Sequence, residues 1–110
     1  MGRPVAGEIV ILPFPQTNLR PGKRRPALVI VSLPLGNLIL CQITTQTRAD
    51  EYCVALARAE LDRGQLAVDS FVRVNRLFTV EKSVVLYVAG RVKDSKLSEV
   101  RMKLRELFAG

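Results

Sequence analysis

Arginines and hydroxyl groups are the side chains of this chain that could do chemistry, because the sequence contains no histidine. Serine–histidine and cysteine–histidine mechanisms of nucleophilic catalysis are therefore excluded. Paired carboxylates and a glycine-rich phosphate loop between a strand and a helix are also missing from the sequence. Arg25 opens one apolar segment, and Thr44 ends another. The planar donors of an arginine fit a phosphate or a phosphorane-like transition state, so this pattern favours phosphate chemistry.

The two apolar segments that would position Arg25 and Thr44 are expected to be strands. Residues 8–13, 26–32 and 38–44 are rich in β-branched side chains and are bounded by turn residues. The short connection between the second and third segments predicts a hairpin. The start of one hairpin strand faces the end of its partner, so we expect Arg25 and Thr44 to be neighbours.

The second half of the chain predicts further strands and one helix. Strands are expected at residues 52–56, 70–74 and 84–92, and residues 77–80 either continue the fifth strand or form another. Residues 60–64 resemble one helical turn that is ended by Gly64. Gly90 is expected at a bulge or a bend. Because residues 8–13 are apolar throughout, both faces of the first strand are expected to be covered.

The helix is predicted over residues 94–108, because apolar side chains recur there at helical spacing. Asp94 or Ser95 can cap its start. Its opposite face carries Lys96 and other charged residues and is expected to be solvated. Many short strands and one terminal helix predict a mainly β fold, a small and strongly bent antiparallel barrel with the helix over an open side.

The composition predicts one domain, residues 1–110, that folds around its own core. A hydrophobic content of 48% argues against disorder. No apolar run approaches the roughly 18 residues that span a bilayer, so no membrane segment is expected. The first residues lack the apolar core of a signal peptide, which predicts an intracellular, cytoplasmic protein.

The net charge of +7 is concentrated in the first part of the chain, where residues 1–48 carry six Lys or Arg and one acid. A basic surface favours nucleic acid, an anionic membrane or an acidic protein as the partner, and a merely solubilising surface is the alternative. Taken alone, the residues predict a small basic β-barrel that binds a polyanion.

Two cysteines, Cys41 and Cys53, both lie in apolar surroundings. They are expected to be buried, reduced thiols in strands, with a disulfide as the other possibility. Two cysteines without a histidine supply too few ligands for zinc, so we expect no metal and no cofactor.

Three stretches, GEIVILPFPQTNLRPGKRRPALVIVS, CQITTQT and SFVRVNRLFTVEKSVVLYVAGRV, together with the final helix, resemble the MazF/PemK-like toxins of type II toxin–antitoxin systems. The resemblance covers nearly the whole chain in order and spacing. It implies an SH3-like barrel that is usually a homodimer. It also implies a metal-independent endoribonuclease (an mRNA interferase) that cleaves single-stranded RNA at short sequences through the RNA's own 2′-hydroxyl. The implied protein partner is an acidic antitoxin.

The same resemblance implies roles for individual residues. Arg25 and Thr44 match the family's catalytic arginine and threonine, and Arg73 matches an arginine that some members use as an acid. Contacts to RNA are expected from Arg20, Lys23, Arg24, Thr45, Thr47, Arg48 and Asn75.

Asn75 is a departure from the family pattern, because members that use an acid–base pair carry an acidic residue there. An amide cannot act as a base near neutral pH. Either Arg25 and Thr44 suffice, another group serves, or activity is weak. Glu8 and Glu51 are the other acids that could contribute to catalysis, and the sequence gives no geometric reason for either.

Structural alternatives exist for each candidate residue. Arg25 could form an ion pair at the sheet edge, Thr44 a strand-end hydrogen bond, and Arg73 could be a solvated strand residue. The alternative function is a non-enzymatic SH3-like barrel that binds nucleic acid or inhibits a protein target.

Overall fold

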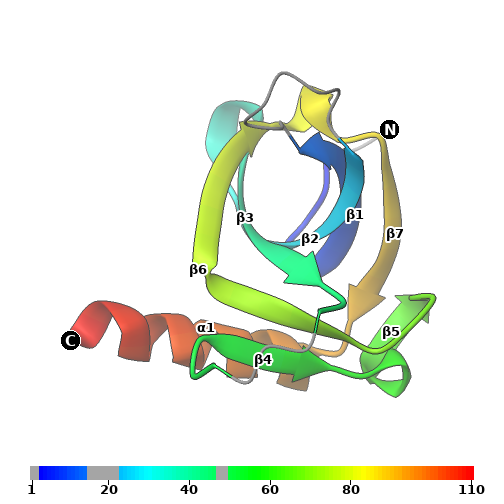
Figure 1. Ribbon diagram of the computed structural model, residues 1–110. Coiled ribbons are helices and arrows are strands. Elements are labelled where there is room, and N and C mark those ends of the chain that lie inside the picture. Colours follow the sequence, from blue (N-terminus) through cyan, green and yellow to red (C-terminus); the bar gives the residue numbers. More distant parts are fainter. Residues whose placement is uncertain (1–2, 15–22, 47–49) are drawn as a thin grey trace.

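One antiparallel sheet of seven strands forms the body of the computed structural model, which describes residues 3–14, 23–46 and 50–110. The sheet curls into an open barrel, and the helix runs along one end of it (Figure 1). The strand order is β4-β6-β3-β2-β1-β7-β5. The strands are β1 (Glu8–Phe14), β2 (Lys23–Ser32), β3 (Asn37–Thr44), β4 (Cys53–Leu56), β5 (Leu61–Gly64), β6 (Ser70–Glu81) and β7 (Tyr87–Val92). Helix α1 is Asp94–Ala109, so the predicted fold class is confirmed.

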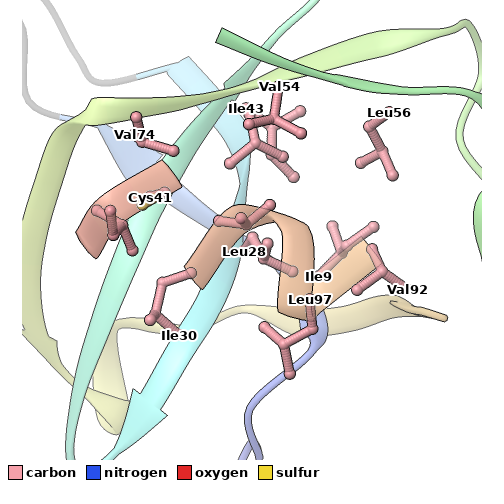
Figure 2. Packing of buried hydrophobic residues seen from close by; sticks show 13 residues of the cluster. Ile9, Leu28, Ile30, Cys41, Ile43, Val54, Leu56, Val74, Val92 and Leu97 are labelled. Carbon is pink, nitrogen blue, oxygen red and sulfur yellow. The ribbon is translucent and has the colours of Figure 1, made fainter. Parts of the chain in front are cut away.

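The sheet buries apolar side chains on both of its faces. Along β2, Leu28 and Ile30 join one cluster, whereas Ala27 and Val29 join another, as the two-residue period of a strand requires. The cluster with Leu28 and Ile30, here called the helix-side cluster, includes buried side chains of α1, and Figure 2 shows Leu97 of the helix among them. Its members are Ile9, Leu28, Ile30, Cys41, Ile43, Val54, Leu56, Val72, Val74, Val92, Leu97, Val100 and Leu104. The opposite cluster comprises Val10, Leu12, Ala27, Val29, Leu38 and Leu40. Both faces of β1 are covered, as predicted.

Strand β6 is interrupted by a bulge but continues across it. Its pairing with β3 passes from Cys41↔Leu77 directly to Gln42↔Arg73, so three residues of β6 have no partner on β3. The strand bends there and its first part pairs with β4 (Figure 1). Residues 70–74 and 77–80 therefore belong to one strand, the first of the two alternatives from the sequence.

The helical turn expected at residues 60–64 is wrong. Leu61–Gly64 is strand β5, which pairs with β7 after a short 3₁₀ turn at Arg58–Glu60. A glycine is nevertheless required at position 64, because its φ is +76° and the backbones of β5 and β7 approach each other closely there. A Cβ at Gly90 would lie 2.5 Å from the Arg63 carbonyl oxygen.

Strand β7 is shorter than predicted, because a 3₁₀ turn occupies Lys82–Val84 and the strand begins at Tyr87. The predicted irregularity at Gly90 is confirmed. The pairing of β7 with β1 passes from Ile9↔Gly90 to Val10↔Val88, which leaves Ala89 as the extra residue of a bulge.

Helix α1 is confirmed, but its expected caps are wrong. Lys93 occupies the N-cap position without a side-chain hydrogen bond, and Asp94 lies in the first turn, 3.5 Å from the Arg91 guanidinium. Leu97, Val100 and Leu104 are buried against the sheet, as the spacing predicts.

Lys96 was expected to be solvated, and this prediction is wrong, because its side chain is only 7% exposed. The Nζ atom lies 2.7 Å from Glu99 Oε1 and 2.9 Å from Glu60 Oε2, and it donates to the Ala55 carbonyl at 2.9 Å. Three oxygens thus satisfy the three donors of one ammonium group. The partners come from α1, the turn before β5 and β4, which the sequence alone could not bring together.

Replacing Lys96 with methionine should destabilise the protein by about 1–3 kcal/mol, because the Ala55 carbonyl would lose its donor in a partly buried place. Urea unfolding of Lys96→Met measures this loss. Arg105→Met, at an exposed position of the same helix, is the matched control. Equal stability of Lys96→Met and the wild type would show that the cluster is not stabilising.

Stability should also fall at acidic pH through Glu60. The Ala57 N–H, 2.7 Å from Oε1, and the nearby Lys96 ammonium hold the pKa of Glu60 below its ordinary value of 4.5. A depressed folded-state pKa contributes stability above 4.5 that is lost as the pH falls through the folded-state value. Unfolding free energies across this range should therefore depend less on pH in Glu60→Gln. An unchanged pH dependence would contradict this role.

Candidate functional site

The start of β2 and the end of β3 meet at one edge of the hairpin. The β2–β3 pairing ends at Ala27↔Gln42, and its register, continued by two residues, puts Arg25 opposite Thr44. Arg25 is paired with Leu12 of β1 on its other side. The register of the hairpin therefore agrees with neighbouring positions for the two residues that the sequence singles out.

Arg73 lies on the same face of the sheet, one strand further. It is paired with Gln42, whereas Thr44 is paired with Phe71, two residues earlier on β6. Such diagonal neighbours are roughly 7–8 Å apart. Val72 belongs to the helix-side cluster, so Arg73 leaves the sheet on the opposite face, with Arg25 and Thr44.

The Thr44 hydroxyl already accepts one hydrogen bond. The N–H of Gln46 donates to Thr44 Oγ1 at 3.2 Å, which is the strand-end bond of the structural alternative. A hydroxyl that accepts from the backbone keeps its own proton to donate. Thr44 can therefore hold the turn and donate to a phosphate oxygen at the same time.

Three cations lie at the start of β2. By the period of the strand, Lys23 and Arg25 leave the sheet on the face of Ala27 and Val29, whereas Arg24 leaves it on the other face. Lys23 and Arg24 are exposed, and Arg25 is half-buried. Among the described residues, no carboxylate forms an ion pair with any of these three. The ion-pair alternative for Arg25 thus finds no support in this part of the chain. A half-buried guanidinium that forms no ion pair with the described acids is suited to an anionic ligand.

The other predicted contact residues are distributed unevenly. Thr45 is exposed directly after β3, and Asn75 is exposed in the β6 bulge. Asn75 is therefore outside the row that contains Arg73. Arg20, Thr47 and Arg48 lie outside the described residues.

Gln42 and Cys53 belong to the same face but were not predicted from the sequence. Gln42 lies two residues before Thr44, so the period of the strand could have indicated it. Cys53 is opposite Arg73 in the β4–β6 register, and this pairing depends on contacts between distant segments. Across three strands, Gln42, Arg73 and Cys53 form one row.

Both cysteines are free, which confirms the reduced thiols. Cys41 is fully buried in the helix-side cluster, and burial raises its pKa to about 12. Cys53 is only half-buried, so the prediction of burial holds for Cys41 alone. Burial, and a hydrogen bond to Asp50, raise the pKa of Cys53, and Arg73 acts in the opposite direction.

Glu8 does not belong to this site. It lies at the other end of β1 from Leu12, the partner of Arg25. Its carboxylate is occupied by the Val5 N–H at 2.7 Å and by Arg63 at 3.1 Å. In the part of the chain that the structure describes, no three metal-ligating side chains of the His, Cys, Asp or Glu type are grouped. Within that same part, no helix is both long and apolar enough to cross a membrane.

The architecture is that of a small curled antiparallel β-barrel that gathers arginines and a threonine at the end of a hairpin. A family model described as the PemK-like, MazF-like toxin of type II toxin–antitoxin systems matches residues 6–108. The chain belongs to this family, and the resemblance drawn from its sequence is confirmed.

Solved structures agree with this family assignment. A crystal structure of MazF from Deinococcus radiodurans is 27% identical, with full coverage of both chains and a TM-score of 0.77. A MazE–MazF structure from the same organism is 25% identical, covers 98% of each chain and has a TM-score of 0.78. An endoribonuclease in complex with its cognate antitoxin from Mycobacterial species shares the fold at 15% identity, with 96% and 95% coverage and a TM-score of 0.72. No curated protein sequence matches the chain.

Proposed function

We propose that this protein is the toxin of a type II toxin–antitoxin system and a metal-independent, sequence-specific endoribonuclease of single-stranded RNA. The observation that supports this proposal is the β2–β3 register, which, continued by two residues, puts Arg25 opposite Thr44 on the face that also carries Arg73. Family membership supports the same activity.

The proposed reaction uses the RNA's own 2′-hydroxyl as the nucleophile. Its oxygen forms a bond to the adjacent phosphorus while the bond to the 5′-oxygen breaks. The products are a 2′,3′-cyclic phosphate and a 5′-hydroxyl, and the proton lost at the 2′-oxygen is balanced by one gained at the 5′-oxygen.

Charge stabilisation is the contribution of the protein in this proposal. The Arg25 guanidinium and the Thr44 hydroxyl donate to the non-bridging oxygens, on which negative charge grows in the transition state. Arg73 adds a second guanidinium. Asn75 cannot accept a proton near neutral pH, so the site acts through positive charge and not through a carboxylate at position 75.

Binding of the RNA backbone is assigned to the exposed cations beside the site. Lys23 and Arg24 contact phosphates, which supply affinity without base specificity. Thr45 and Asn75 are exposed near the candidate site and are assigned to RNA contact. The sequence-based assignment extends this contact to Arg20, Thr47 and Arg48.

Arg25→Ala should abolish RNA cleavage and leave the fold intact, because the side chain stabilises developing charge and is not part of either apolar cluster. Arg25→Lys should also be impaired, since a point charge cannot replace the planar fork. The measurement is cleavage of single-stranded RNA in EDTA, with circular dichroism to check folding. Arg105→Ala, exposed on α1, is the control. Wild-type cleavage by Arg25→Ala would end this assignment.

A non-enzymatic module that binds RNA or inhibits a protein is the second candidate, favoured by Asn75 in place of an acid. The same incubation in EDTA separates the two candidates. Cyclic-phosphate ends support the endoribonuclease, whereas intact RNA after long exposure at high protein concentration supports the module.

An acidic antitoxin is the proposed protein partner, in line with the MazE–MazF structures of the relatives. The carboxylates of an acidic, partly disordered segment would occupy sites meant for phosphates. Apolar side chains between these acids would fill the gaps between strands as the segment folds on binding. Lys23→Glu with Arg24→Glu should therefore weaken antitoxin binding and RNA binding together, as measured by titration calorimetry. The loss should shrink at high salt. Unchanged antitoxin affinity with weaker RNA binding would show that the two sites do not overlap.

A homodimer is proposed on the basis of the family resemblance and of exposed apolar side chains. Leu86, Tyr87 and Val88 are 46%, 51% and 41% exposed and line one groove beside Pro4. Burying this surface against a second copy would remove apolar area from water. Light scattering at micromolar protein should give a dimer, and Leu86→Asp with Val88→Glu should give a monomer. A monomeric wild type would contradict the proposal.

A further inference from the structure

Cys53 and Arg73 face each other across neighbouring strands. They are direct partners in the β4–β6 register. Val54 and Val72, the residues next to them, belong to the helix-side cluster, so Cys53 and Arg73 both leave the sheet on the face of the candidate site. The Nε atom of Arg73 is buried and has no hydrogen-bond partner among the described residues. The orientation of this guanidinium must therefore be fixed by other neighbours.

The turn before β4 places Asp50 beside the same thiol. Asp50 Oδ1 accepts the Tyr52 N–H at 2.9 Å, and the Asp50 carbonyl accepts the Cys53 N–H at 3.4 Å. The Tyr52 carbonyl in turn accepts the N–H of Val74 at 3.0 Å. Since Val74 follows Arg73, these bonds tie the acidic turn to the strand that carries the arginine.

Asp50 and Arg73 act on the Cys53 thiol in opposite directions. Burial raises its pKa, its hydrogen bond to the Asp50 carboxylate raises the pKa further, and Arg73 lowers it. A thiol can donate its proton to a carboxylate and offer sulfur lone pairs to a guanidinium. From α1, the charged residues Glu99, Lys103 and Glu106 line a pocket of about 310 Å³ together with Cys53.

We propose that Asp50, acting through the Cys53 thiol, positions the Arg73 guanidinium in the site. Asp50 and Cys53 are positioning residues, because they act on the arginine and not on the RNA. The kinetic consequence rests on the proposed endoribonuclease function. The contact itself can be tested in protein that cleaves nothing.

The contact is tested by the pH dependence of Cys53 alkylation with iodoacetamide in the full chain. Asp50→Asn should lower the pKa of the thiol, because a negative charge is removed while an oxygen remains for the Tyr52 N–H. Arg73→Gln should raise the pKa. Glu51→Gln, an exposed acid next to Asp50, is the matched control and should change nothing. An unchanged pKa in both Asp50→Asn and Arg73→Gln would overturn the proposal.

The Cys53→Ala variant is the control that shows whether Cys41 contributes to the alkylation signal. Cys41 is fully buried with a pKa raised to about 12, so Cys53→Ala should show no alkylation over the same pH range. The signal of the wild type then belongs to Cys53 alone.

The positioning role is tested by the kinetics of RNA cleavage. Asp50→Asn and Cys53→Ala should lower kcat by roughly tenfold or more with KM nearly unchanged, since a misplaced group loses transition-state contact. Cys53→Ser should retain most of the activity, because a hydroxyl donates and accepts in the same place. Equal loss in Cys53→Ser and Cys53→Ala, or an unchanged kcat in Asp50→Asn, would overturn the role. If the wild type cleaves no RNA, the proposed function fails while the thiol titration still decides the contact.

Discussion

The bulge in β6 is the constraint on which the candidate site depends. If the β3–β6 register continued from Cys41↔Leu77 without a bulge, Arg76 would lie opposite Gln42. Because of the bulge, Arg73 takes that place and pairs on its other side with Cys53. The bulge therefore decides which arginine joins Arg25 and Thr44, and it also bends the strand toward β4 (Figure 1).

The buried ammonium group of Lys96 holds helix α1 against the sheet. Lys96 joins α1 to the Ala55 carbonyl of β4 and to Glu60 before β5. Strand β4 is at the edge of the sheet, so its outer carbonyl groups need a partner from outside the sheet. The same strand carries Cys53, which means that docking of the helix and the geometry around Arg73 share one element.

Local patterns predicted the elements that the chain builds from neighbouring residues. Alternation and turn residues located the β2–β3 hairpin, and helical spacing located α1. The expected proximity of Arg25 and Thr44 rests on that hairpin. Strand β5 was not predicted, because its four residues form a strand only through pairing with β7, which is distant in the sequence. The position of Cys53 beside Arg73 and the burial of Lys96 were not predicted for the same reason, since their partners are distant in the chain.

The charge distribution accounts for one surface that could serve both the proposed RNA and the proposed antitoxin. Lys23, Arg24 and Arg25 are free of ion pairs to acids of the described residues, so either phosphates or carboxylates can pair with them. The groove between β4 and α1 differs, because Glu99 and Glu106 line it together with Lys103. A polyanion is therefore attracted more strongly at the start of β2 than in this groove, where charges of both signs lie. A basic chain can thus direct an anionic ligand to one face, where its arginines lie beside a hydroxyl that can donate.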